Sequence, residues 1–236
     1  MLKVENLSVS YNNAVAVDNI SFEVKKNEAV AILGANGTGK TTLLNAIFNT
    51  VKKSGKVIYK DRDISNMHTK DIVSMNIAYV PDKRTVFNDL TVYENLEIAA
   101  KDIITSKKRR YFMESLEHIF ERFPNLKEKI TLKAGYLSGG EQQMLSIAQG
   151  LIREPEMFVM DEPTAGLSPK LTKSVFEIVS FMKHKKITVL MVEQNVNKTL
   201  QYTDRAYIMN VGKIVDSGYS ETFLKSKSVK KAYLGG

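Results

Sequence analysis

The sequence GANGTGKT at residues 34–41 decides the fold of this chain. Its spacing, G-x-x-x-x-G-K-[ST], is that of a loop in which glycines let backbone N–H groups surround phosphate oxygens. The preceding residues 28–33, EAVAIL, are typical of a short buried strand, and the following residues 42–48, TLLNAIF, have apolar side chains at helical spacing. Because strand, loop and helix occur together, we predict a nucleotide-binding site rather than an ordinary glycine-rich turn.

The side chains of this loop have specific roles at a nucleotide. Lys40 reaches the terminal phosphates, and the hydroxyl of Thr41 is a magnesium ligand. The glycines leave room for the backbone to wrap around the phosphates. We therefore expect a nucleotide and Mg²⁺ at this loop. The predicted nucleotide-binding residues are Gly34, Asn36, Gly37, Thr38, Gly39, Lys40, Thr41 and Thr42.

A second motif converts nucleotide binding into hydrolysis. Residues 157–160, MFVM, form an apolar run that ends in Asp161 and Glu162. Strands buried on both faces have this pattern, and ligands gather at the carboxyl ends of such strands in parallel sheets. We expect Asp161 to hold Mg²⁺ through its water shell and Glu162 to polarise the attacking water. A lone Asp-Glu pair is usually a solvated turn, but the apolar strand and the upstream loop favour the catalytic interpretation.

The sequence LSGGE at residues 137–141 predicts a second anion cradle. It precedes residues with the apolar spacing of a helix, and the free N–H groups at a helix start favour negative charge. Ser138 can add a hydroxyl donor and also cap this helix. The chain has one nucleotide-binding loop, so this cradle either acts in cis or completes a site on another molecule. Its candidate residues are Ser138, Gly139, Gly140 and Glu141.

Composition limits the class of protein. The chain has 236 residues, 43% of them hydrophobic, which is enough for one large domain or two small ones. It has no cysteine, which excludes disulfides and thiolate metal sites. Apolar runs reach only about six residues, against the roughly 18 needed to cross a bilayer, and the N-terminus lacks the pattern of a signal peptide. We expect a cytoplasmic protein. The net charge of +8 suits anionic lipid, nucleic acid or nucleotide phosphates alike.

Hydrophobic patterning predicts an α/β fold. The beginning of the chain alternates apolar and polar residues as antiparallel strands do, and the later part alternates helices with buried strands, as in a parallel α/β core. Between them lies a helical insertion, in which the basic residues 107–110 form a solvated loop or a helix start. The predicted strands are 2–9, 20–24, 56–59, 77–80, 187–192, 206–210 and 213–215, the last two joined by a hairpin turn at 211–212. The predicted helices outside the nucleotide loop are 92–100, 111–123, 171–182 and 220–233.

Taken in order, these motifs resemble the ATP-binding subunits of ABC transporters, and the resemblance covers residues 1–236. It implies a single ABC ATPase domain: a P-loop NTPase core with a parallel sheet, an N-terminal antiparallel β subdomain, and a helical subdomain inserted at about 88–152. In that family two subunits face head to tail, and the signature turn of one, here 138–141, closes on the γ-phosphate held by the other. The resemblance therefore implies ATP as the nucleotide and a dimer partner, either a second copy or a related ATPase subunit.

The resemblance also assigns individual positions and reveals departures from the family pattern. Tyr11 matches the aromatic residue that stacks on adenine. Ser168 stands where the family has an interface aspartate, Asp82 where a glutamine senses Mg²⁺ and the γ-phosphate, and Gln194 where a histidine contacts the γ-phosphate. Asp82 still offers an oxygen to magnesium, directly or through water. Gln194 can donate a hydrogen bond but cannot take a charge, which excludes proton shuttling at this position.

The departures at Asp82 and Gln194 are similar to the pattern of the ATPases of branched-chain amino acid uptake systems, in particular their second, shorter ATPase type. The similar stretches are 80–87 (VPDKRTVF), 139–145 (GGEQQML), 192–195 (VEQN) and 232–236 (AYLGG). Such systems combine two ATPase subunits with two membrane permease subunits and an extracytoplasmic solute-binding protein. The resemblance implies a peripheral protein at the cytoplasmic face of the cell membrane, whose segment 82–90 receives a permease helix.

Other functions of the same superfamily stay open. ATPases for urea, amides or other solutes resemble the chain as well, because this subunit does not choose the solute. ATPases that act on DNA or on ribosomes share the architecture and would suit the positive charge. The DNA-acting class carries long heptad coils and the ribosomal class normally has two cassettes in one chain, and this sequence has neither. We therefore expect no nucleic-acid partner.

Overall fold

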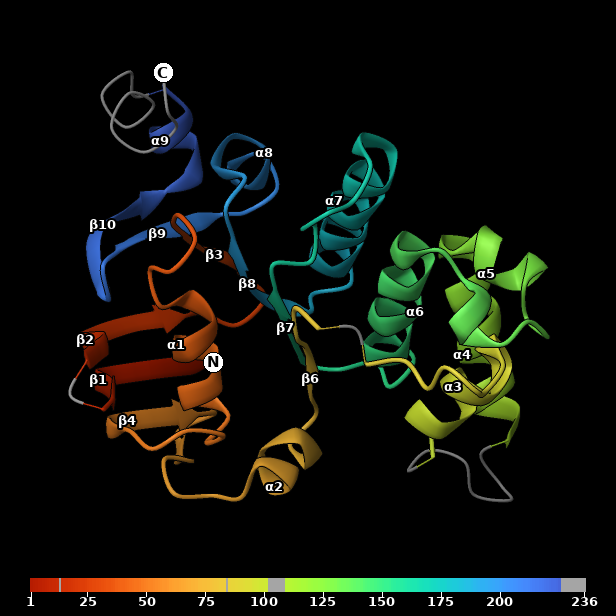
Figure 1. Cartoon of the computed structure of the whole chain (residues 1–236), viewed down its shortest axis with the longest axis horizontal. Helices are drawn as coiled ribbons and strands as arrows, with labels where there is room; N and C mark the ends of the chain where they lie inside the picture. Colours follow the sequence, from red (N-terminus) through yellow and green to blue (C-terminus); the bar gives the residue numbers. More distant parts are fainter. Residues whose placement is uncertain (13, 84, 102–108, 226–236) are drawn as a thin grey trace.

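Figure 1 shows the computed structural model, which describes residues 1–12, 14–83, 85–101 and 109–225. Its strands form two sheets. The antiparallel sheet consists of β1 (Leu2–Tyr11), β2 (Ala14–Val24), β4 (Ser54–Tyr59) and β5 (Arg62–Asp63), in the order β2-β1-β4-β5. The second sheet consists of β3 (Ala29–Leu33), β6 (Ile77–Val80), β7 (Met157–Asp161), β8 (Thr188–Glu193), β9 (Arg205–Asn210) and β10 (Lys213–Tyr219), in the order β10-β9-β3-β8-β7-β6.

The second sheet is the buried centre of the molecule. Its strands β9, β3, β8, β7 and β6 are parallel, and β10 is antiparallel to β9. Every residue of β3, β7 and β8 is buried, which explains why these strands have continuous apolar sequences. The side chains of β3 alternate between two core clusters: Ala29, Ala31 and Leu33 belong to one, and Val30 and Ile32 to the other. The predicted α/β fold with an antiparallel N-terminal sheet is confirmed.

Helices cover both faces of this sheet. The core cluster of Ala29 and Leu33 includes residues of α3, α4, α6 and α7, whereas the other cluster joins the sheet to α1 and the antiparallel sheet. The helices are α1 (Lys40–Ile47), α2 (Thr69–Ser74), α3 (Val92–Ala99), α4 (Arg109–Arg122), α5 (Pro124–Glu128), α6 (Gly139–Leu151), α7 (Pro169–His184), α8 (Val196–Leu200) and α9 (Ser220–Lys225), with a 3-10 turn at Ala134–Tyr136.

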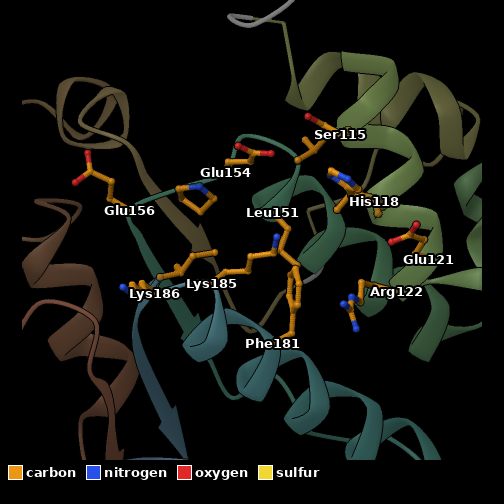
Figure 2. A pocket seen from close by; sticks show the side chains of 14 residues that line it. Ser115, His118, Glu121, Arg122, Leu151, Glu154, Glu156, Phe181, Lys185 and Lys186 are labelled. Atoms are coloured by element: carbon orange, nitrogen blue, oxygen red, sulfur yellow. The ribbon is translucent and has the colours of Figure 1, made fainter. Parts of the chain in front are cut away.

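Helices α3 to α6 follow one another between β6 and β7 and gather at one side of the sheet, in yellow to green at the right of Figure 1. Helix α4 faces α7 of the core across a cavity of about 480 Å³, which Figure 2 shows from close by. The guanidinium of Arg122 on α4 lies 4.2 Å from the ring centre of Phe181 on α7. None of the predicted site residues lines this cavity, so it is separate from the nucleotide loop.

Some element boundaries differ from the sequence predictions. Helix α1 begins at Lys40, earlier than the predicted start at residue 42, because Gly39 ends the loop in a left-handed conformation. In the basic segment, Arg109 and Arg110 begin α4, while residues 107–108 lie outside the described residues. The predicted helix at 220–233 is present as α9, and its part beyond residue 225 also lies outside the described residues. The short helices α2, α5 and α8 were not predicted.

Candidate functional site

The predicted nucleotide loop connects β3 to α1 and runs against the backbone of two other strands. Gly39 precedes α1 with a φ of 98°, and a Cβ there would lie 2.3 Å from the carbonyl oxygen of Ala16 in β2. A Cβ at Gly34 would lie 2.4 Å from the carbonyl oxygen of Met209 in β9. Contacts this short are forbidden, so both positions require glycine.

Of the three predicted catalytic residues, Glu162 contacts both Lys40 and Gln194. The Lys40 ammonium lies 3.1 Å from one carboxylate oxygen of Glu162, and Gln194 Nε2 donates to the other oxygen at 2.5 Å. Lys40 is only 3% exposed and also donates to the carbonyls of Gly34 and Ala35, at 2.9 and 2.8 Å. Glu162 follows β7 and Gln194 follows β8, so the carboxyl ends of two adjacent parallel strands bring these side chains to the loop.

Glu162 has a backbone conformation that is uncommon outside glycine. Its φ is 45°, and its N–H donates to the carbonyl of Val192 in β8 at 3.0 Å. Such a conformation persists only where the surroundings hold it, and it is frequent at functional sites. Here the bond to β8 and the contacts with Lys40 and Gln194 hold it. The turn directs the carboxylate into the cavity at the nucleotide loop, which Glu162 lines.

Asp161 and Thr41 form the candidate magnesium site. The Thr41 hydroxyl donates to Asp161 Oδ1 at 3.1 Å. Asp161 is fully buried and its Oδ2 has no hydrogen-bond partner. Burial, with a smaller contribution from the charges of Asp82 and Glu162, raises the pKa of Asp161 to about 6. A buried carboxylate oxygen without a donor, next to a hydroxyl, fits a cation that would satisfy both.

Asp82 lies close to this pair without touching it. Its exposed carboxylate accepts a hydrogen bond from the backbone N–H of Lys83 at 2.7 Å, and its charge contributes to the raised pKa of Asp161. Among the residues that the structure describes, no cluster of three or more carboxylate or histidine side chains forms a metal cage. The oxygen donors Thr41 and Asp161 suit Mg²⁺, which usually keeps several water and phosphate ligands.

Tyr11 shares a cavity with the nucleotide loop. The cavity measures about 290 Å³ and also has Gly37, Gly39, Lys40, Thr41, Thr42 and Glu162 in its lining. The side chain of Tyr11, at the end of β1, is 46% exposed and free to meet a ligand. Gly34, Asn36 and Thr38 do not line this cavity; the Thr38 hydroxyl instead donates to the Ala35 carbonyl at 2.9 Å and stabilises the loop.

The second predicted cradle lies at the start of α6. Ser138 is the N-cap of this helix: its hydroxyl accepts from the N–H of Glu141 at 3.4 Å, and the Glu141 carboxylate accepts from the Ser138 N–H at 2.9 Å. The capping role predicted for Ser138 is thus confirmed, and Glu141 completes a capping box. None of Ser138, Gly139, Gly140 and Glu141 lines the cavity at the nucleotide loop. This geometry does not support action in cis.

Ser168, which stands where the resemblance implies an aspartate, has a structural role. It is the N-cap of α7, and its hydroxyl accepts from the N–H of Leu171 at 3.4 Å. Aspartate and serine are both good caps, so the departure preserves the helix start.

Glu193, the last residue of β8, was not predicted as a site residue. It is only 2% exposed, and one of its oxygens accepts from the N–H and the hydroxyl of Thr164, at 3.1 and 2.7 Å. Its other oxygen accepts from the N–H of Gln194 at 3.1 Å. Burial raises the pKa of Glu193. The side chain thereby joins the loop that follows Glu162 to the strand end that carries Gln194. The sequence signal that could have indicated Glu193 is a carboxylate at the end of the apolar run TVLMVE, residues 188–193.

Comparison with known proteins agrees with this geometry. A family model described as ABC transporter matches residues 17–165, more than half of the chain. The chain belongs to the ABC transporter family. It is therefore an ABC ATPase that binds ATP and hydrolyses it for transport.

Relatives of this family cover the whole chain. The branched-chain amino acid transport ATP-binding protein BraG of Pseudomonas aeruginosa is 38% identical over 100% of both chains. The lipopolysaccharide export ATP-binding protein LptB of Haemophilus influenzae is 34% identical over 100% of this chain and 97% of its own. A solved ABC ATP-binding cassette in its ADP conformation is 31% identical, with a TM-score of 0.82 over 100% of this chain and 99% of the other. Within the described residues of this ABC ATPase, no helix is long and apolar enough to cross a membrane.

The contacts of Glu193 predict a selective effect on turnover. Glu193→Gln puts an amide in place of a carboxylate whose two oxygens accept from Thr164 and from the Gln194 N–H. The NH₂ group of the new amide must therefore face the backbone N–H of Thr164 or of Gln194. We expect kcat for ATP hydrolysis to fall about tenfold because the support of Glu162 and Gln194 loosens, while KM for ATP changes little. Glu177→Gln on α7, an exposed carboxylate paired with Lys173, is the matched control.

The same variant predicts a pH effect on stability. Because burial raises the pKa of Glu193 above its ordinary 4.5, folding disfavours its ionised form. The melting temperature of the unaltered protein, measured relative to Glu193→Gln, should therefore decrease as the pH rises from 4.5 through the native pKa, and level off above it. A parallel pH dependence of the two melting temperatures, or a change in KM alone, would contradict this account of Glu193.

Proposed function

We propose that this ABC ATPase is the energising subunit of a membrane importer for branched-chain amino acids. The observation that supports this cargo is the full-length similarity to BraG, together with Asp82 and Gln194 in place of the glutamine and histidine of the wider family. The partners would be two membrane permease subunits and, indirectly, an extracytoplasmic solute-binding protein. The subunit would then lie peripherally at the cytoplasmic face of the cell membrane.

In the proposed reaction, Lys40 first exchanges its contacts within the chain for contacts with ATP. Its ammonium now contacts Glu162 and the carbonyls of Gly34 and Ala35. When ATP occupies the loop, Lys40 would bind the terminal phosphates instead, and Glu162 would be released to polarise the attacking water. Gln194 would keep the Glu162 carboxylate oriented by donating to it, without taking a proton. Thr41 and Asp161, with Asp82 through water, would hold Mg²⁺, which neutralises charge on the phosphates.

The signature residues are proposed to act on the nucleotide of a second subunit. Ser138, Gly139 and Gly140 lie outside the cavity of their own chain, and the start of α6 offers backbone N–H groups and a favourable dipole to an anion. A head-to-tail dimer would bring them to the γ-phosphate held by the partner's P-loop. The partner is either a second copy of this chain or a related ATPase subunit.

Closure of that dimer would move the helical region toward the partner. We propose one ABC ATPase domain at 1–236, in which residues of about 88–152 form a helical subdomain that moves relative to the sheet. The adjoining segment 82–90, where Phe87 is 51% exposed, would contact a permease helix. Nucleotide binding would thus be coupled to the membrane subunits through a segment that neighbours the candidate magnesium site.

Another cargo is supported by one specific comparison. The relative LptB, at 34% identity over the whole chain, is named for lipopolysaccharide export. Urea or amide uptake is a further alternative within the family. All of these share the ATPase chemistry, so the cargo is decided by the complete transporter.

Transport assays test the cargo. In membranes that contain the complete transporter, we expect leucine, isoleucine or valine with the solute-binding protein to stimulate ATP hydrolysis and accumulate inside. Lys40→Ala should abolish both ATP hydrolysis and solute accumulation, because the terminal phosphates lose the Lys40 ammonium. Stimulation by urea or an amide, with no response to the branched-chain amino acids, would replace the proposed cargo while leaving the ATPase assignment intact.

The contact of Glu162 with Lys40 predicts a separation of binding from hydrolysis. Glu162→Gln keeps the size of the side chain but removes its ability to polarise water. We expect kcat to fall at least about 100-fold while ATP binding is retained, so that ATP-bound dimers accumulate. Size-exclusion chromatography with ATP and single-turnover hydrolysis would measure the two effects. Unchanged steady-state hydrolysis would remove Glu162 from the proposed mechanism.

The cap geometry of Ser138 allows the signature turn to be tested against a second helix that begins in the same kind of capping box. Ser138→Asp keeps an N-cap acceptor for α6, loses the hydroxyl that donates to the Glu141 carboxylate at 2.9 Å, and places a negative charge where the partner's γ-phosphate is proposed to lie. We expect hydrolysis to decrease at least about 100-fold with ADP binding at the P-loop unchanged.

Thr91→Asp is the matched control for Ser138→Asp. Thr91 caps α3 in the same kind of capping box, with Glu94 in the place of Glu141. Thr91→Asp should retain ATP hydrolysis, and its melting temperature should be close to that of Ser138→Asp. Equal loss of hydrolysis in both variants would assign the effect to the helix caps rather than to a phosphate contact.

A further inference from the structure

The turn between β9 and β10 holds a valine in a conformation that valine rarely adopts. Val211 and Gly212 have φ angles of 41° and 75°, as in two-residue hairpin turns with both central residues left-handed. Such turns favour Asn, Asp or Gly at the first position, because a side chain branched at Cβ is strained at positive φ. The Val211 side chain is 79% exposed, so packing of this side chain does not offset the strain. Strain of this kind is typical of functional sites.

Backbone contacts fix this turn beside the P-loop. The N–H of Gly212 donates to the carbonyl of Thr38 at 3.0 Å, and its carbonyl accepts from the N–H of Asp18 at 2.8 Å. A Cβ at Gly212 would lie 3.0 Å from the carbonyl oxygen of Ala16, so the turn rests closely on β2. These contacts hold the backbone of Val211 at the rim of the nucleotide cavity, with its side chain exposed.

Three exposed apolar side chains meet at that rim. Tyr11, Val15 and Val211 are 46%, 57% and 79% exposed and line the same cavity. They come from β1, from β2 and from the β9–β10 turn. The charged residues of the lining, Lys40 and Glu162, belong to the proposed phosphate end. The cavity thus has one polar and one apolar end, as a nucleotide has a charged polyphosphate and a flat base.

We infer that Val211 is a base-binding residue, which closes the apolar end of the cavity over the base that stacks on Tyr11. The inference rests on the proposed nucleotide site and adds a wall to it. Val211 would stabilise the bound base through dispersion and by excluding water from it. Among the described residues that line the cavity, the charged side chains are Lys40 and Glu162 at the proposed phosphate end, and none carries an amide. An apolar wall discriminates weakly between ligands that differ only in polar groups, so Val211 would support adenine and guanine alike.

The test compares two probes that share phosphates and differ in the base. Val211→Asn suits a left-handed turn but removes the apolar wall. We expect the Kd for ADP and for GDP to rise about three- to tenfold, and the Kd for tripolyphosphate, which has no base, to stay unchanged. The melting temperature of the free protein should stay equal or increase, because the strain is relieved. Isothermal titration calorimetry and thermal unfolding of the full chain measure these quantities.

Val215→Asn is the matched control. Val215 is an exposed valine on β10 that does not line the cavity, and its replacement should leave all three Kd values unchanged. Unchanged ADP affinity in Val211→Asn would overturn the inference. Equal weakening of ADP and tripolyphosphate would also overturn it, because the effect would then come from distortion of the P-loop through Thr38. If the unaltered protein binds tripolyphosphate but not ADP, the base site fails; if it binds neither, the proposed nucleotide site fails with it.

Discussion

The close approach of the P-loop to two neighbouring backbones is the constraint on which the site depends. Gly34 lies against the carbonyl of Met209 in β9, and Gly39 against the carbonyl of Ala16 in β2, so the loop is the junction of the parallel and antiparallel sheets. Because both sheets meet at one loop, side chains from distant parts of the sequence reach one cavity. Tyr11 arrives from the antiparallel sheet, and Glu162 from the parallel one. A side chain at either glycine would force the loop and the facing backbone apart.

The charged groups at this junction can exchange their present contacts for contacts with a bound nucleotide. The buried ammonium of Lys40 contacts Glu162 and two loop carbonyls, and Asp161 is buried with one oxygen left without a donor. An unpaired charge in such surroundings is costly, which explains why burial raises the pKa of Asp161. A nucleotide with its magnesium ion would supply anionic oxygens to Lys40 and a cation to Asp161 together. In the proposed cycle, Glu162 becomes available for catalysis only when that exchange has occurred.

The sequence predicted those parts of the site that depend on local spacing. The P-loop, the fully buried strands β3 and β7, and the cap of α6 by Ser138 were predictable because a few neighbouring residues specify each of them. Glu193 was missed because its partner, Thr164, lies on a loop 29 residues earlier, and only the pairing of β7 with β8 brings them together. Val211 was predicted in a hairpin turn, but its place beside Tyr11 depends on contacts between the two sheets. The roles of Asp82 and Gln194 came from family resemblance alone.

The separation of the signature turn from the P-loop explains how a small ligand could drive a large motion. Ser138 and Glu141 satisfy each other in a capping box, which fixes the start of α6, while Lys129 also binds Glu141 at 2.5 Å. A rigid helix start that lies outside the cavity of its own chain can gain a phosphate contact only by approaching another molecule. ATP would then bind the closed dimer more tightly than the open one, and this difference in affinity is what shifts the equilibrium between them. Hydrolysis, which removes the shared phosphate, would reverse the shift. A cradle that contacted the nucleotide of its own chain could not shift this equilibrium, because ATP would then bind the open and the closed dimer equally tightly.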